Sequence, residues 1–218
     1  MGHHVDTVDP QGPPHVHHMD ARTAYHAAKF GMWLFLATEI LLFGGLFCAF
    51  ILFRWMYLEE FHHASKHLNV WMGGTNTVVL IISSFFAAKA VDAAQHNDNK
   101  KVVRNLLVTI VCACGFLVIK YFEYSAKYHH GLFPTSPEFN SPDFNHAYKC
   151  FFALYYCMTG LHALHVLIGM AILGWVISKA RKDRFSNRYY TPVEVGALYW
   201  HLVDLIWIYL FPLLYLVG

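Results

Sequence analysis

The sequence predicts an all-α protein that crosses a membrane as a bundle of five helices. Three observations predict this fold class. The chain of 218 residues is 56% hydrophobic and only 14% charged, whereas soluble domains average about 25% charged residues. Five apolar stretches reach the length of about 20 residues that a helix needs to cross a bilayer. A few ionisable residues recur within these stretches at helical spacing, which is typical of a polytopic membrane protein with packed helices.

The five stretches lie at residues 30–53, 70–91, 103–124, 148–178 and 193–217. They form one membrane domain, 30–218, which follows a polar, His-rich tail at 1–29. Eleven of the sixteen Lys and Arg residues lie in the tail or in the loops after the second and fourth stretches. Because basic loops stay in the cytoplasm, the N-terminus is expected in the cytoplasm and the C-terminus on the outer side.

Composition also limits the classes of partner and cofactor. The formal net charge of +2 is too small to indicate a nucleic-acid partner. None of the five cysteines has zinc-type spacing, so buried free thiols are the favoured interpretation. The tail holds six of the sixteen histidines. Such a tract suits metal buffering, but a flexible polar segment without ligand geometry is favoured.

The last apolar stretch carries three ionisable residues on one helical face. Glu194 and His201 are seven residues apart, and Asp204 follows three residues later. Because an isolated polar group in hydrocarbon is costly, this face is expected to meet protein or water. We expect His201 and Asp204 to bind each other, or to join histidines of the fourth stretch in one polar seam.

Glu39 lies near the middle of the first stretch, where a carboxylate should be either neutral or paired. Glu39 is interpreted either as a group that handles protons or as a structural residue that makes a hydrogen bond between helices. In the fourth stretch, His162 and His165 share a face, which suits metal or haem ligation as well as structural hydrogen bonds. The structural interpretation is favoured. Lys120 and Glu123, with opposite charges at i and i+3, predict an interfacial ion pair.

These segments resemble subunit III of the haem-copper respiratory oxidases. Residues 30–43, with Glu39, resemble the family's span with a conserved carboxylate, and Asn76 and Thr77 match the start of the following span. The YFEY at 121–124 and the TGLHALHVLIG at 159–169 match two further family segments. The YWHLVDLIW at 199–207 is similar to the family's last helix, YWHFVDVVW. Together the matches cover roughly residues 30–218.

The resemblance is strongest to the five-span bacterial form, which lacks two N-terminal helices of the seven-span form. Glu39 and Glu194 resemble cytochrome c oxidases more than ubiquinol oxidases, although a ubiquinol oxidase remains the alternative. The family's lipid-filled cleft would need helices from a partner subunit here. The resemblance thus implies a multi-pass protein of the bacterial inner membrane.

The resemblance also implies a subunit without redox centres. The haems and copper belong to partner subunits I and II, whereas subunit III packs on subunit I, binds phospholipid and supports assembly and sustained proton uptake. No catalytic residue, cofactor ligand or metal ligand is therefore expected in this chain, and membership of a larger supercomplex stays open. The candidates for supporting proton transfer are Glu39, His162, His165, Glu194, His201 and Asp204.

Two other functions compete with this one. A membrane cytochrome b would bind haem through His162 or His165 together with His201, and would show a Soret band. A small transporter would use Glu39, Glu194 and Asp204 as an ionic path, but it would be expected to show a repeat between two halves. The five stretches show no such halves, which disfavours a transporter.

Overall fold

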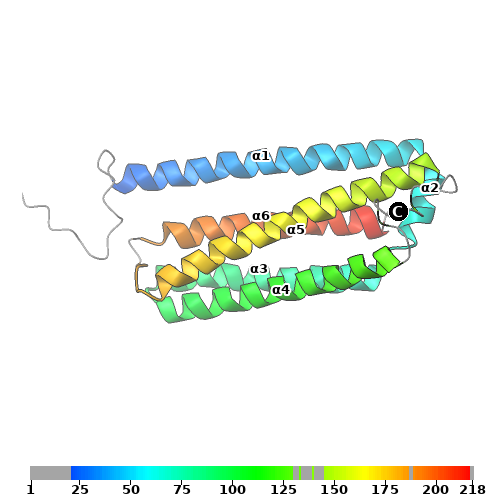
Figure 1. Cartoon of the computed structure of the whole chain (residues 1–218). Coiled ribbons are helices and arrows are strands. Elements are labelled where there is room, and N and C mark those ends of the chain that lie inside the picture. Colours follow the sequence, from blue (N-terminus) through cyan, green and yellow to red (C-terminus); the bar gives the residue numbers. More distant parts are fainter. Residues whose placement is uncertain (1–20, 130–132, 134–138, 140–144, 187–188, 217–218) are drawn as a thin grey trace, which may run out of the picture.

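The computed structural model describes residues 21–129, 133, 139, 145–186 and 189–216, and its regular elements are all helical. The chain runs up and down the long axis of the bundle (Figure 1). In chain order, the elements are α1 (Ala21–Met56), α2 (Leu58–Ser65), α3 (Val70–Gln95), α4 (Asn99–His129), α5 (His146–Ala180), α6 (Thr191–Phe211) and the π-helix η1 (Pro212–Leu216).

The structure confirms the predicted fold class. Helices α1, α3, α4 and α5, and the segment that α6 and η1 form together, are each long and apolar enough to cross a membrane. Helices α1, α3, α4 and α5 are longer than the corresponding apolar stretches. In particular, α1 begins at Ala21, ahead of the stretch that starts at Phe30. Residues 1–20, which hold most of the His-rich tail, lie outside the described residues.

Helix α6 occupies the centre of the bundle. It packs against α3, α5 and α1, while α4 packs against α3 and α5. Figure 1 shows α1 along one side and the α3–α4 pair along the opposite side, with α5 and α6 between them. The two largest fully buried side chains, Trp200 and Trp207, both come from α6. Much of α1 is exposed, with Trp33 and Leu41 at 57% and 76% exposure, as expected for a surface that meets lipid or another subunit.

Local sequence explains where several helices begin. The side chain of Asn69 accepts hydrogen bonds from the backbone N–H groups of Trp71 and Met72, which caps α3. Pro192 lies in the first turn of α6, where its missing N–H costs no helical hydrogen bond. Asn97 has φ of 59° between α3 and α4, a left-handed conformation that Asn tolerates well and that permits the tight reversal.

Gly169 allows α5 and α6 to approach closely. A Cβ atom at this position would lie 2.9 Å from Cε3 of Trp200 and 3.2 Å from Cε1 of Tyr199. Both rings are buried and cannot move away freely. The glycine therefore sets the distance between the two helices that carry most of the candidate site.

We expect Gly169→Ala to destabilise the full chain by about 1–3 kcal/mol, because the added methyl group overpacks the ring of Trp200. Unfolding by SDS in mixed micelles, followed by far-UV circular dichroism, measures the change. Gly174→Ala is the matched control, since it lies in the same helix and a Cβ there meets nothing within 4 Å. The control should be neutral or slightly stabilising, and equal effects at both positions would contradict the packing argument.

Candidate functional site

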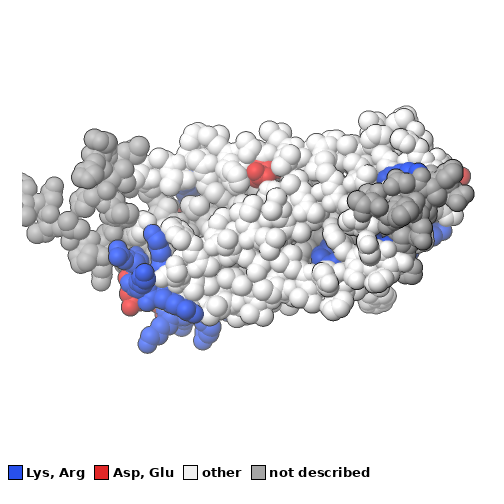
Figure 2. All heavy atoms as spheres, viewed as in Figure 1, with Lys and Arg blue, Asp and Glu red and all other residues white. Residues whose placement is uncertain are grey.

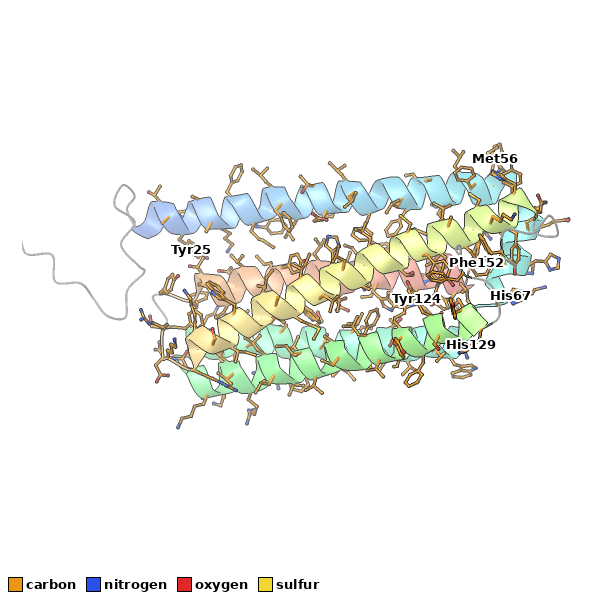
Figure 3. The ribbon with its side chains drawn as sticks, in the orientation of Figure 1. Tyr25, Met56, His67, Tyr124, His129 and Phe152 are labelled. Carbon is orange, nitrogen blue, oxygen red and sulfur yellow. The ribbon has the colours of Figure 1, made fainter. Side chains whose placement is uncertain are left out.

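Ionisable side chains of the spans form separate clusters at different depths. The first cluster lies where α1 and α6 begin. Nζ of Lys29 is 2.7 Å from Oε1 of Glu194, and the hydroxyl of Tyr25 donates to Oε2 of Glu194 at 3.0 Å. Lys29 also donates to the Tyr25 hydroxyl at 3.2 Å. Figure 3 places Tyr25 at the start of α1. This cluster ties the first helix to the central one.

The second cluster joins α1 to α5 near the middle of the bundle. Nε2 of His165 is 2.9 Å from Oε2 of Glu39, and Nδ1 of His165 is 2.8 Å from the carbonyl oxygen of Leu161. A carbonyl oxygen only accepts, so Nδ1 must carry a hydrogen. Glu39 and Nε2 then share one further proton, as a carboxylic acid beside an imidazole or as a carboxylate beside an imidazolium. The pair is electrically neutral in either form, which suits a site in hydrocarbon.

The third cluster is buried near the opposite end and is centred on Glu123. Lys120 donates to Oε2 and Lys127 to Oε1 of this carboxylate, both at 2.8 Å. The hydroxyls of Tyr215 and Tyr155 donate to Oε1 at 2.6 and 3.0 Å. The three charged residues are at most 5% exposed. Two ammonium groups therefore share a single buried carboxylate. The ion pair predicted between Lys120 and Glu123 is present, and both of its side chains are buried inside the bundle.

Sequence reasoning missed Lys127 and the two tyrosines of this cluster. Lys127 could have been found, because it lies four residues after Glu123 on the same helical face. Tyr155 and Tyr215 come from α5 and η1, and no local spacing connects them to Glu123. Pro212 lies where α6 ends and the π-helix begins, and the π-helix brings Tyr215 to the carboxylate.

His162 lies inside the bundle without a hydrogen-bond partner among the described residues. It is 0% exposed, and both of its ring nitrogens are unpaired. Its ring lies 5.2 Å from the ring of Trp207 and 5.4 Å from that of Phe116. Nζ of Lys120 lies 4.6 Å from the Trp207 ring, within the distance of a cation–π contact. Trp207 therefore connects His162 to the cluster around Glu123.

Hydroxyl groups on α3 bind polar side chains of α6. Nδ1 of His201 is 2.7 Å from Oγ of Ser84, which also lies beside the carboxyl group of Asp204. The indole N–H groups of Trp200 and Trp207 donate to Ser83 and Thr77, at 3.0 and 3.2 Å. These bonds fix the register between α3 and α6.

The prediction that these histidines and Asp204 form a single polar seam between the fourth and fifth spans is therefore wrong. His165 binds Glu39 on α1, His162 packs between aromatic rings, and His201 binds Ser84 on α3. The physical reason is that helix neighbours decide the partners. α1 and α3 supply a carboxylate and a hydroxyl that the sequence pattern of α5 and α6 cannot reveal.

None of the described residues forms a group of three or more His, Cys, Asp or Glu side chains that could hold a metal ion. The histidines considered for haem have different neighbours, since His162 packs on Trp207 and His201 binds Ser84. The clusters can hold helices together and can share or exchange a proton. Figure 2 shows that Lys and Arg gather towards the two ends of the molecule, while the face between them is nearly free of charge.

Comparisons with known proteins agree with this architecture. The sequence model of the family described as "Cytochrome c oxidase subunit III" matches residues 14–218. The chain is 33% identical over 188 residues to cytochrome c oxidase subunit 3 of Synechocystis sp., covering 86% of this chain and 74% of the relative. It is 32% identical over 216 residues to the protein of that name from Thermostichus vulcanus, covering 96% of both.

A third relative, cytochrome c oxidase subunit 3 of Corynebacterium diphtheriae, is 31% identical over 189 residues and 86% of both chains. The family match spans most of this chain, and the structure supplies the membrane-spanning helices that such a subunit needs. The chain therefore belongs to the cytochrome c oxidase subunit III family, and is a multi-pass membrane subunit of a haem-copper oxidase complex.

Proposed function

We propose that this chain is a subunit III without redox centres in a proton-pumping cytochrome c oxidase. The haems and copper that reduce O2 to water would belong to subunits I and II. The chain would pack on subunit I, bind phospholipid, and support assembly and sustained proton uptake. One observation carries the proposal: the three glutamates of the spans are each paired with a basic side chain of the same chain, in Lys29–Glu194, Glu39–His165 and Lys120–Glu123–Lys127.

Such pairing is what a supporting subunit requires. A buried charge that is already paired and hydrogen-bonded orders the helices around it, but it leaves few groups free to act on a substrate. Among the residues proposed for proton support, Glu39, His165 and Glu194 are held in hydrogen bonds with one another or with Lys29 and Tyr25. The function of the chain would then be to keep its partner subunit correctly packed and supplied with protons during turnover.

Glu39 and Glu194 support cytochrome c, rather than a quinol, as the electron donor. The assignment rests on the resemblance of these two residues to cytochrome c oxidases. In the structure, both carboxylates bind α1 to the rest of the bundle. Oxidation of reduced cytochrome c by the purified complex, measured beside oxidation of ubiquinol, tests this assignment. Faster turnover with ubiquinol would identify the alternative.

The distribution of basic residues supports the proposed orientation. Most Lys and Arg residues lie at the end of the bundle where α3 ends, α4 begins and α5 ends. Figure 2 shows a dense group of basic side chains at that end. This end would face the cytoplasm and the C-terminus would face the periplasm of a bacterial inner membrane. Protease accessibility of tags placed at either terminus tests the direction.

Co-purification from native membranes in mild detergent tests the central proposal. The chain should be recovered with a larger polypeptide whose visible spectrum shows haem, and the isolated chain should show no Soret band. Recovery as a stable monomer that works alone would contradict the proposal. A Soret band from the isolated chain would instead support a haem-binding membrane anchor.

Glu39→Gln is expected to preserve assembly and the haem spectrum, with a modest change in initial oxygen consumption and a faster loss of activity during turnover. The glutamine amide can donate to Nε2 of His165, so the variant keeps a hydrogen bond at this position but removes the carboxyl group. Glu194→Gln, which changes the ion pair with Lys29 at the start of α6, is the control. It shows whether the effect depends on where in the bundle the carboxylate is removed. A fall in initial turnover of about a thousandfold, some 4 kcal/mol of transition-state stabilisation, would place Glu39 in the chemistry itself.

A further inference from the structure

One face of the central helix is exposed and carries a polar side chain. His201, Leu205 and Ile208 lie four and three residues apart, so they share one face of α6. Leu205 and Ile208 are 49% and 42% exposed, and His201 is partly exposed. The bond from His201 to Ser84 connects this face to α3. The outer α3–α6 face is defined here by His201, Leu205, Ile208, Ser84, Ile81 and Val78.

The hydrogen bonding of His201 is incomplete. Nδ1 is bound to Ser84, and the imidazole makes no further hydrogen bond with the described part of the chain. Its Nε2 is therefore open to a donor or acceptor from outside. Three residues further along α6, Oδ1 of Asp204 is buried and has no hydrogen-bond partner among the described residues. Glu39 and His165 differ from His201 in this respect: both side chains are slightly exposed, but they bind each other.

The open nitrogen lies deep in the membrane. His201 is ten residues into α6, which places it roughly 15 Å along the axis from the start of the helix. Ser84 lies near the middle of α3. Lipid tails at this depth offer no hydrogen bond, and polar side chains in membrane spans usually face protein. The exposed face of α4, with Val111 and Val118, is apolar and suits lipid.

We propose that the outer α3–α6 face docks a membrane-spanning helix of the neighbouring oxidase subunit, which supplies a hydrogen-bonding side chain to Nε2 of His201. This inference rests on the proposed function, and it identifies the surface through which the chain would contact its partner subunit. The partner must supply a side chain, because its backbone groups are already bonded within its own helix. The exposed Leu205, Ile208 and Ile81 would pack against the apolar part of that helix, and a polar side chain at mid-membrane depth would specify its register.

The first experiment places a photo-reactive phenylalanine analogue at Leu205 in the complete complex, with the same analogue at Val111 as the matched control. Both positions are exposed, so neither change should disturb folding. We expect cross-linking from position 205 to the largest polypeptide of the complex, and from position 111 to lipid. Cross-linking from position 205 only to lipid, or to a second copy of this chain, would overturn the proposed surface.

The second experiment compares His201→Phe with His201→Gln. The glutamine retains a hydrogen-bonding group, whereas the phenylalanine does not. We expect His201→Phe to be retained with the haem-containing polypeptide about tenfold less well during a detergent titration, the effect of losing one buried hydrogen bond, and His201→Gln to restore most of the retention. Equal retention of all three proteins would refute the proposed contact.

The two proposals fail in distinguishable ways. If the unmodified chain does not co-purify with a haem-containing polypeptide, the proposed function fails and the docking surface fails with it. If the chain co-purifies but position 205 gives no protein cross-link, only the docking surface fails. Far-UV circular dichroism of each variant shows whether a loss of retention comes from misfolding.

Discussion

Glu123→Gln is expected to destabilise the folded chain by about 3–5 kcal/mol, because two buried ammonium groups would lose the carboxylate that they share. Lys120 and Lys127 both lie 2.8 Å from this carboxylate. The phenols of Tyr155 and Tyr215 would lose an ionised acceptor as well. Unfolding of the full chain by SDS in mixed micelles, followed by far-UV circular dichroism, measures the change.

Lys127→Met is the informative control. It leaves one lysine beside one carboxylate, so the remaining pair is balanced, and a change of about 1 kcal/mol or less is expected. Replacing all three charged residues by apolar side chains of similar size should also cost much less than Glu123→Gln alone. A larger loss of stability for Lys127→Met than for Glu123→Gln would refute the sharing of one carboxylate by two lysines.

Trp207→Ala is expected to cost about 3–5 kcal/mol, the range for removing a large aromatic side chain from a packed interior. Its indole contacts the rings of His162 and Phe116, lies below the ammonium group of Lys120 and donates to Thr77. These partners come from α3, α4 and α5, so the cavity would open between four helices. The same unfolding measurement applies.

Trp207→Phe separates the two roles of this side chain. It keeps an aromatic ring between His162 and Phe116 but removes the N–H that binds Thr77. A loss near 1 kcal/mol is expected for one hydrogen bond, together with a smaller packing loss. If Trp207→Ala were no worse than Trp207→Phe, the ring contacts would not stabilise the bundle as described.

These expectations distinguish a tightly held part of the bundle from a loosely held one. Around Trp207 and Glu123, four helices interlock through buried rings and shared charges. By contrast, α1 is joined to the bundle mainly by Lys29–Glu194, by Glu39–His165 and by a row of buried side chains that includes Leu36, Phe43 and Phe50. A supporting subunit would need the first part for its own stability, while the exposed surface of α1 is available to lipid and to other subunits.

Hydropathy was sufficient to predict the number of long helices, because each of them must satisfy its backbone hydrogen bonds within itself and cover them with apolar side chains. It placed their ends less well. α1 begins ahead of Phe30 because Tyr25 and Lys29 are held in helical conformation by Glu194, a residue that is distant in sequence. Polar residues thereby extend a helix that an apolar stretch alone would end.

Spacing along one helix predicted contacts only within that helix. The pair of Lys120 and Glu123 follows from their i and i+3 positions. Spacing also placed His201 and Asp204 on one face of α6, where both lie beside Ser84. It did not predict Ser84 itself, nor the separation of His162 from His165, because two residues on one helical face can meet different neighbouring helices.

The sequence by itself determined that this chain is a five-helix membrane protein of the subunit III family, since length, hydropathy and short motifs are local properties. Only the tertiary structure decided which polar group meets which. Glu39 pairs with His165, Glu123 binds two lysines and two tyrosines, and His201 turns towards α3. The reason is physical: a buried polar group must find a partner, but the helix that supplies the partner depends on packing between distant segments, which no local pattern specifies.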